Sequence, residues 1–289
     1  MAIIEITSSS ELERYLKSLE SEGIDTIAMD LEGEFNLHCY GEHLCLVQIF
    51  DGKREIIIDP VAHPNLRALD TLFSKRSLMK IMYDSSSDAS LIQHVRGVRL
   101  MTILDLKPAV SLLGYAAQGL SSVLEAEFNF RVPDKKRFQR FNWMRRPISP
   151  QAVEYAMNDV RMLFMLKERL FEKLRQRGLM DAYILKNLYI QNGEITPLDK
   201  DRYKKAKGYA RLSRDGRERF RELFEVRDRR ARRANLPPNT IFSNRDLLDT
   251  AAGRLPTSDI AARITTKKLA PGEKSALAEE LVAVISKRS

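Results

Sequence analysis

The stretch IDTIAMDLEGEF, residues 24–35, combines an apolar strand pattern with two closely spaced acids. Its first half supplies the side chains of a buried strand, and its second half contains Asp30 and Glu32. Side chains alternate faces along a strand, so both carboxylates point the same way, about 6–7 Å apart along the strand axis. Like charges this close repel each other unless a cation lies between them. The stretch therefore predicts a buried strand that ends in two acids on one face, and it raises the question of what offsets their repulsion.

The composition is that of a globular protein. The chain has 289 residues, of which 44% are hydrophobic and 30% charged, and no apolar run approaches the ~20 residues that cross a bilayer. The opening MAIIEITSSSELERYL lacks a basic region followed by a long apolar core, so we expect no secretory signal. Cys39 and Cys45 are the only cysteines, which does not suggest a disulfide framework and favours a reducing, cytoplasmic location.

Positive charge is concentrated in the last third of the chain. From residue 197 to the end, 23 Lys and Arg residues outnumber 13 Asp and Glu residues, whereas the part before residue 197 has a net charge of −1. Such asymmetry favours a nucleic-acid-binding domain attached to a nearly neutral body. A solvated helical surface is the alternative, and the charge pattern alone fits both.

Short strands and helices alternate in the first part of the chain. The expected strands are residues 24–31, 44–50, 55–58, 79–83 and 100–104. The first three are joined by short polar connections, which favours an antiparallel meander. The clearest helix is expected from Pro150 to about Arg177, where apolar residues follow the 3.6-residue period. These elements predict an α/β fold with a five-stranded mixed sheet flanked by helices.

The rest of the chain predicts a second, all-helical domain. Expected helices cover about residues 213–235, 244–253 and 272–286, after a polar stretch typical of a linker. The predicted division is therefore an α/β domain at 1–195, a linker at 196–212 and a helical domain at 213–289.

Further candidate site residues lie outside the first strand. Asp88 is in the first turn of an expected helix, and Tyr155 and Asp159 are four residues apart, on one face of another helix. Each feature alone is weak, because most such Tyr–Asp pairs are exposed surface pairs. Together with Asp30 and Glu32 they form a combination that is stronger evidence for a functional site than any one of them alone.

Three segments resemble the exonuclease motifs of the DEDDy 3′–5′ exonucleases, and most closely the ribonuclease D branch with the related exosome nuclease. They are MDLEGEF…LCLVQIFDGKREIIIDP, KIMYDSSSDASLIQHVRGVRLMTILDLKPA and FNWMRRPISPQAVEYAMNDVRMLFML, within about residues 24–174. The tail segment FEVRDRRARRANLPPNTIFSNRDLLDTAAGRLPTS resembles the HRDC domain of ribonuclease D. The resemblance implies a ribonuclease H-like nuclease domain followed by an HRDC-like, nucleic-acid-binding domain.

The resemblance also implies roles for the candidate residues. The catalytic set is Asp30, Glu32, Asp88, Tyr155 and Asp159. Its four carboxylates would hold two divalent cations, Mg²⁺ or Mn²⁺, because oxygen ligands favour hard ions. The tyrosine would orient the attacking water. Two features depart from the family pattern: Tyr83 stands where related sequences usually have His, and Glu34 is an additional acid.

Basic and aromatic residues alternate in the loop KKRFQRFNWMRRP, residues 135–147, as single-strand binding requires. The predicted RNA contacts are Lys136, Arg137, Arg140, Trp143 and Arg145 in this loop, and Arg229 and Arg233 among the arginines that crowd one tail helix. The alternatives are that Trp143 and Phe141 are packing anchors beneath the sheet and that the tail arginines form a solvated face.

The sequence thus predicts a metal-dependent 3′–5′ exoribonuclease that releases nucleoside 5′-monophosphates. Its expected partner is RNA with a free 3′ end, such as a tRNA precursor, and neither a membrane nor a protein partner is implied. The alternatives are an exonuclease acting on DNA or on short oligoribonucleotides, and a catalytically silent RNA-binding protein. The presence of all five signature residues disfavours the silent protein. The basic tail disfavours a pure dinucleotide scavenger, which needs no remote phosphate contacts.

Overall fold

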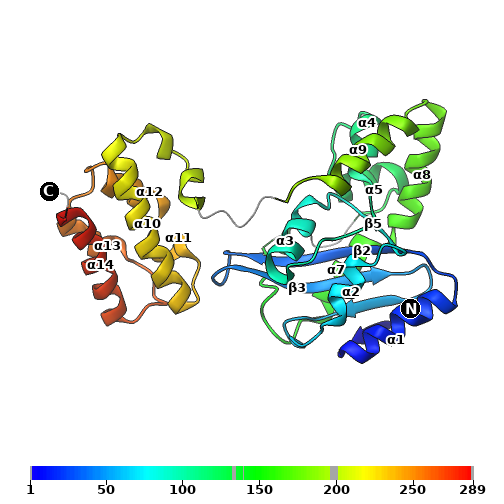
Figure 1. Ribbon diagram of the computed structural model, residues 1–289, viewed down its shortest axis with the longest axis horizontal. Helices are drawn as coiled ribbons and strands as arrows, with labels where there is room; N and C mark the ends of the chain where they lie inside the picture. The colour runs from blue at the N-terminus through cyan, green and yellow to red at the C-terminus, as the bar shows by residue number, and fades with distance from the viewer. Residues whose placement is uncertain (1, 132–134, 139, 196–200, 288–289) are drawn as a thin grey trace. The chain divides into compact units, whose positions relative to one another are not determined.

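The computed structural model describes residues 2–131, 135–138, 140–195 and 201–287, without the side chains of residues 135 and 136. The chain divides into two compact units (Figure 1). The first comprises Met1–Glu34 and Glu42–Pro197, and the second comprises Phe35–Gly41 and Leu198–Ser289. No helix within the described part of the chain is both long enough and apolar enough to cross a membrane.

The first unit is built on a six-stranded sheet with the order β1-β4-β3-β2-β5-β6 (Figure 1). Its strands are β1 Ile3–Ile6, β2 Thr26–Phe35, β3 Glu42–Phe50, β4 Glu55–Ile58, β5 Met79–Met82 and β6 Ile103–Asp105. β3 and β4 are antiparallel, whereas the pairs β1–β4, β2–β5 and β5–β6 are parallel. The sheet is therefore mixed, as the sequence predicts.

The strand β1 is the sixth strand that the sequence analysis does not predict. It pairs in parallel with β4, with Ile3 opposite Glu55. It has only four residues, and Ile6 is the only one of them that is buried. A short edge strand of this kind lacks the alternation of buried and exposed residues by which strands are recognised.

Helices cover both faces of the sheet (Figure 1). They are α1 Ser9–Ser21, α2 Ala68–Ser74, α3 Ser86–Arg96, α4 Lys107–Leu112, α5 Leu120–Phe128, α6 Lys135–Phe138, α7 Pro150–Arg161, α8 Leu163–Gln176 and α9 Met180–Asn192. The helix expected from Pro150 to about Arg177 is therefore two helices, divided at Met162. On β2, Ile27 and Met29 belong to the core that includes residues of α1, α2 and α3, whereas Ala28 belongs to the core that includes residues of α7 and α8. By the same alternation Asp30 and Glu32 lie on the Ala28 face.

The second unit is helical, as predicted. Its elements are η1 Arg202–Lys205, η2 Tyr209–Arg211, α10 Arg214–Ala234, α11 Pro238–Ile241, α12 Asn244–Ala251, η3 Thr257–Asp259, α13 Ile260–Arg263 and α14 Pro271–Ser286. Phe220 and Leu223 of α10 pack with Leu247 and Leu277 in its core. Of the predicted linker, residues 196–200 lie outside the described residues, and η1 contributes the buried Tyr203 to the same core.

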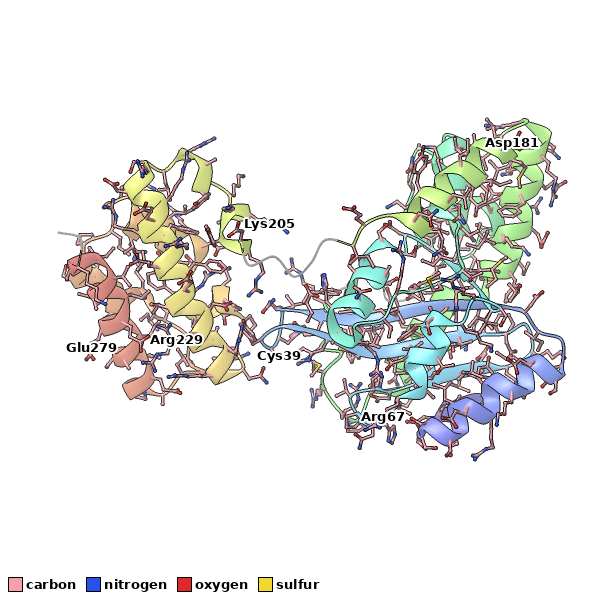
Figure 2. The ribbon with its side chains drawn as sticks, viewed as in Figure 1. Cys39, Arg67, Asp181, Lys205, Arg229 and Glu279 are labelled. Carbon is pink, nitrogen blue, oxygen red and sulfur yellow. The ribbon has the colours of Figure 1, made fainter. Side chains whose placement is uncertain are left out.

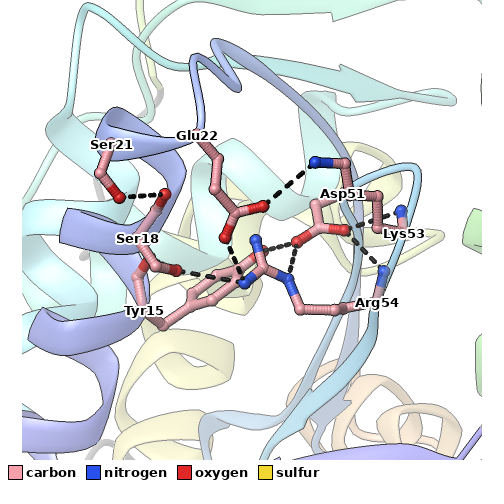
Figure 3. Close-up of polar contacts among 7 residues, drawn as sticks. All are labelled: Tyr15, Ser18, Ser21, Glu22, Asp51, Lys53 and Arg54. Carbon is pink, nitrogen blue, oxygen red and sulfur yellow. Dashed lines mark hydrogen bonds and ion pairs between the residues drawn. The ribbon is translucent and has the colours of Figure 1, made fainter.

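A polar cluster joins the end of α1 to the turn between β3 and β4 (Figure 3). The Asp51 carboxylate accepts hydrogen bonds from the backbone N–H groups of Lys53 and Arg54, at 2.9 and 2.7 Å. It also accepts from Arg54 Nε at 2.7 Å and from the Tyr15 hydroxyl at 3.3 Å. Arg54 Nη1 donates to Glu22 at 2.9 Å. This cluster fixes α1 against the sheet, and it contains none of the predicted site residues.

Lys80 on β5 has a fully buried side chain. Its ammonium group donates to the carbonyl oxygens of Lys75 and Met101, at 2.7 and 3.0 Å, and more weakly to that of Phe73 at 3.4 Å. Burial, followed by the nearby charge of Lys75, lowers the pKa of Lys80 to about 7. Lys80 thus supplies hydrogen bonds to three carbonyls at the cost of burying an ionisable group.

We expect Lys80→Met to lower the free energy of unfolding by about 2 kcal/mol, because three carbonyls that are buried or partly buried lose their donor. The difference in unfolding free energy between the wild type and this variant should also depend on pH. The unfolded chain binds more protons than the folded protein between about pH 7 and the ordinary lysine pKa of about 10.4, so wild-type stability should rise relative to the variant across that interval. Urea unfolding of both proteins from about pH 7 to about pH 10 measures this. A difference that stays constant with pH would contradict the prediction.

Candidate active site

Three of the predicted acids meet at one place in the first unit. Asp30 and Glu32 of β2 and Asp159 of α7 each offer a carboxylate oxygen, and these atoms all lie within 4.8 Å of one another. Among the residues that the structure describes, this is the one group of three or more potential metal ligands at such spacing. All three side chains are half-buried. Asp159 follows Glu32 by 127 positions in the sequence. The two acids of the strand and the acid of the helix thus form one cluster of carboxylates.

Asp88, in the first turn of α3, is not one of these three ligands. Its charge nevertheless raises the pKa values of Asp30 and Glu32, so it lies within electrostatic range of both. The pKa of Asp88 itself is raised to about 8, first by burial and then by the charges of Asp105 and Asp84. The fourth predicted acid therefore lies beside the group of three without joining it as closely.

The electrostatics of the group fit a bound cation. Burial raises the pKa of Asp30 well above its ordinary value, and the charges of Asp88 and Asp159 raise it further. The pKa of Glu32 is also raised well above its ordinary value, first by burial and then by Asp159 and Asp88. Burial and neighbouring acids oppose the ionisation of these carboxylates. A divalent cation that neutralises their charge stabilises the ionised form. Because every donor is a carboxylate oxygen, the group suits hard ions such as Mg²⁺ and Mn²⁺.

Tyr155 lies one turn before Asp159 on α7 and is half-buried. Its pKa is raised, first by burial and then by the charges of Asp159, Glu32 and Asp30. The phenol therefore lies near the same three acids and stays protonated at neutral pH. A protonated phenol in this place donates a hydrogen bond, and it is a poor general base.

Asp105 is a supporting residue that the sequence analysis did not identify. It is buried at the end of β6, and its carboxylate accepts from the backbone N–H groups of Asp84 and Ser85, at 3.0 and 2.8 Å. It also accepts from the Ser85 hydroxyl at 2.8 Å. These bonds fix the turn that leads into α3 and hence the position of Asp88. The signal in the sequence is an acid at the end of a strand that is followed by a helix.

Arg161 is a second residue that the sequence analysis did not identify. Its Nε and Nη2 atoms donate to the two carboxylate oxygens of the buried Glu55 on β4, each at 2.8 Å. A second acid, Glu154, accepts from Nη2 at 2.9 Å. This two-pronged contact is the strong form of an Arg–carboxylate pair. It attaches the end of α7, two residues after Asp159, to the sheet.

Arg161→Met is expected to lower the free energy of unfolding by about 3 kcal/mol, because Glu55 would remain buried without its cation. Lys167→Met is the matched control, since it removes a cation from a more exposed pair with Glu168 on α8. The control substitution should lower the free energy of unfolding by about 0.5 kcal/mol or less. Urea unfolding of both variants decides the matter, and equal losses would mean that the Glu55 contact contributes no more than a surface pair.

The predicted RNA contacts have different surroundings. Trp143 is only 5% exposed and packs edge-on against Phe141, with ring centroids 4.8 Å apart. Trp143 therefore packs in the interior, as the alternative interpretation holds, and its ring is not available to stack on a base in this structure. Arg137, Arg140 and Arg145 are exposed. The predicted contact at residue 136 lies outside the described side chains.

The tail arginines are also heterogeneous. Arg229, labelled in Figure 2, donates to Glu280 of α14 at 3.4 Å but keeps 53% of its side chain exposed. Arg233 is exposed. In contrast, Arg227 is buried and donates to the carbonyl of Phe242 at 2.9 Å. One helix therefore carries both structural arginines and solvent-facing ones.

The two departures from the family pattern are accommodated locally. The Tyr83 hydroxyl donates to the carbonyl of Gln118 at 2.5 Å, so its side chain is attached to the segment before α5. Glu34 is buried on β2 and is not one of the three clustered acids.

Comparison with known proteins agrees with this architecture. Residues 3–175 match the family model described as a 3′–5′ exonuclease, and residues 217–285 match the HRDC domain. Ribonuclease D of Desulfotalea psychrophila is 28% identical over 249 residues, which cover 83% of this chain and 65% of that protein. Exosome complex exonuclease RRP6 of Saccharomyces cerevisiae is 26% identical over 272 residues, which cover 88% of this chain and 36% of that protein. The chain thus spans less than two thirds of the length of these relatives.

Solved structures share the fold. RNase D of Escherichia coli superposes with a TM-score of 0.77 at 21% identity, covering 99% of this chain and 75% of that one. The catalytic core of RRP6 from Trypanosoma brucei gives 0.75 at 24% identity, covering 100% and 81%. The predicted ribonuclease H-like α/β class, followed by a helical HRDC domain, is confirmed. Because the 3′–5′ exonuclease model matches more than half of its residues, the chain belongs to the 3′–5′ exonuclease family.

Proposed function

We propose that this protein is a metal-dependent 3′–5′ exoribonuclease of the ribonuclease D type. One observation carries the proposal: Asp30, Glu32 and Asp159 gather their carboxylates within 4.8 Å, with Asp88 and Tyr155 in electrostatic range. Membership of the 3′–5′ exonuclease family supports it. A half-buried cluster of acids without a counter-charge would destabilise the fold, so a function that uses a cation explains why these side chains meet.

The residues have distinct roles in this proposal. The carboxylates of Asp30, Glu32, Asp88 and Asp159 hold two divalent cations, Mg²⁺ or Mn²⁺. Such ions, when bound, neutralise the scissile phosphate and stabilise the attacking and leaving oxygens. Tyr155 donates its phenolic proton in a hydrogen bond that orients the attacking water. The water oxygen would form a bond to phosphorus and give up a proton to solvent while the P–O3′ bond breaks. The leaving 3′ oxygen would take a proton from solvent, and a nucleoside 5′-monophosphate would be released.

RNA is the proposed substrate because relatives of this chain are ribonucleases. The Escherichia coli neighbour is described as an exoribonuclease involved in structured RNA processing. The second unit also carries basic side chains on its surface, and Lys207, Arg211, Arg245 and Arg254 line one of its clefts. Arg137, Arg140, Arg145, Arg229 and Arg233 are the other proposed phosphate contacts. We further propose structured RNA such as tRNA precursors as the substrate and the cytoplasm as the location.

The test uses RNA labelled at its 5′ end and carrying a single-stranded 3′ tail, incubated with the protein and Mn²⁺. We expect a ladder that shortens from the 3′ end and nucleoside 5′-monophosphates by thin-layer chromatography. A 3′-phosphate on the same RNA should slow the reaction, and EDTA should stop it. Internal cuts, nucleoside 3′-monophosphates, or equal RNA loss with the Asp30→Asn protein would contradict the proposal. The same assay on DNA and on a dinucleotide distinguishes the alternative substrates.

A further inference from the structure

We propose that Phe138 is a positioning residue for Tyr155: its ring, supplied by the basic loop, holds the phenol in the orientation that catalysis uses. This inference rests on the proposed function, because it assumes that Tyr155 acts on the attacking water. It adds a residue and a physical link between the loop and the site that family membership does not assign.

The contact itself is an aromatic stack. The ring centroids of Phe138 and Tyr155 are 4.7 Å apart, and the ring planes differ by 27°. Phe138 is only 3% exposed, although its neighbours Arg137 and Arg140 are exposed. A buried aromatic residue beside exposed basic ones marks a point at which the segment is attached to the core. Here the attachment point is the ring of the proposed catalytic tyrosine.

Phe138 also contacts a second aromatic ring, in a tilted arrangement, and that ring contacts a third edge-on. Phe141 lies 5.4 Å from Phe138, and Trp143 lies 4.8 Å from Phe141. Arg146 then attaches the loop to the sheet, donating to the carbonyl of Cys45 at 2.8 Å and to Asp59 at 2.6 Å. Phe138 therefore contacts Phe141 as well as Tyr155, and these contacts restrict its ring.

Tyr155 needs such a contact. It is half-buried, so enclosure by the core does not by itself fix the orientation of its ring. An aromatic stack stabilises a ring beyond the area that it buries, which favours one ring orientation by about twofold to tenfold. Small errors in the placement of a catalytic group reduce rates by one to two orders of magnitude.

The loop also carries charge onto this stack. The guanidinium carbon of Arg137 lies 5.3 Å from the centroid of the Phe138 ring, within the range of a cation–π contact. An RNA phosphate that binds the exposed Arg137 would therefore act beside the ring that positions Tyr155. The basic loop is in this view a support for the catalytic residue as well as a proposed contact surface for the substrate.

A double-mutant cycle tests the inference, with kcat, KM and Mn²⁺ affinity measured for Phe138→Ala, Tyr155→Phe and the double variant. We expect Phe138→Ala to lower kcat about tenfold, with KM and Mn²⁺ affinity unchanged. In the Tyr155→Phe background the same change should alter kcat less than about twofold, because its target is already gone. Phe50→Ala is the matched control, since Phe50 pairs with Phe164 in the same core, with ring centroids 5.8 Å apart.

A second readout does not depend on turnover. Proteins labelled with 3-fluorotyrosine give a ¹⁹F resonance for residue 155, which is identified by its loss in Tyr155→Phe. Removing the stacked ring in Phe138→Ala should shift or broaden this resonance, whereas Phe50→Ala should leave it in place. Equal kcat losses in both backgrounds, or an unchanged resonance, would overturn the inference alone. Wild-type kcat in Tyr155→Phe would instead overturn the proposed role of Tyr155, and the inference with it.

Discussion

Asp30→Asn is expected to reduce the rate of RNA hydrolysis by about 10³-fold or more, the largest loss that we predict for a single substitution. Asp30 belongs to the group of three clustered acids, and burial followed by the charges of Asp88, Asp159 and Glu32 raises its pKa. An amide has about the same shape as the carboxylate but carries no charge, so the fold is preserved while the attraction for a cation is lost. Mn²⁺ binding, measured by calorimetry, should weaken in parallel with activity.

Although Asp30→Asn should reduce activity and Mn²⁺ binding, it should stabilise the fold when no metal is bound. In EDTA, Asp30→Asn should raise the melting temperature, because one of several mutually repelling acids is removed. Asp25→Asn is the matched control: it removes one negative charge from an exposed residue next to β2 and outside the acid group. The control should keep both activity and Mn²⁺ affinity. If both variants lose activity equally, the acid group is not the site of the reaction.

Tyr155→Phe is expected to lower kcat about 10²-fold with Mn²⁺ affinity unchanged, because the variant loses a hydrogen bond to the water and keeps every carboxylate. Burial and the three nearby acids raise the pKa of Tyr155 above its ordinary value. The phenol therefore stays protonated throughout the range from about pH 6 to about pH 9. The ratio of wild-type to variant kcat should accordingly be constant over that range. A ratio that grows with pH would show that the phenolate acts as a base.

The parts of the site that follow local periodicity could be predicted from the sequence. Alternation along β2 places Asp30 and Glu32 on one face, and the spacing of Tyr155 and Asp159 places both on one face of α7. Only the sheet topology brings these elements together, and the family resemblance supplied that information in advance. It did not supply the detail that Asp88 lies outside the closest group of acids.

The supporting residues could not be predicted, because their partners are distant in sequence. Glu55 and Arg161 are 106 positions apart, and nothing near either residue indicates the other. The positions of Phe138 and Trp143 could not be predicted for a different reason, because their local pattern fits two interpretations. A loop of alternating basic and aromatic residues fits both base stacking and packing, and the structure buries both rings. The strand β1 was missed because its exposed residues mask the usual alternation.

Crystals soaked in Mn²⁺ and measured at the manganese absorption edge test the central claim most directly. We predict an anomalous peak between the carboxylates of Asp30, Glu32 and Asp159, and no peak there in Asp30→Asn crystals soaked in the same way. Manganese bound elsewhere on the protein, with nothing between these three side chains, would contradict the claim that the acids form a metal centre.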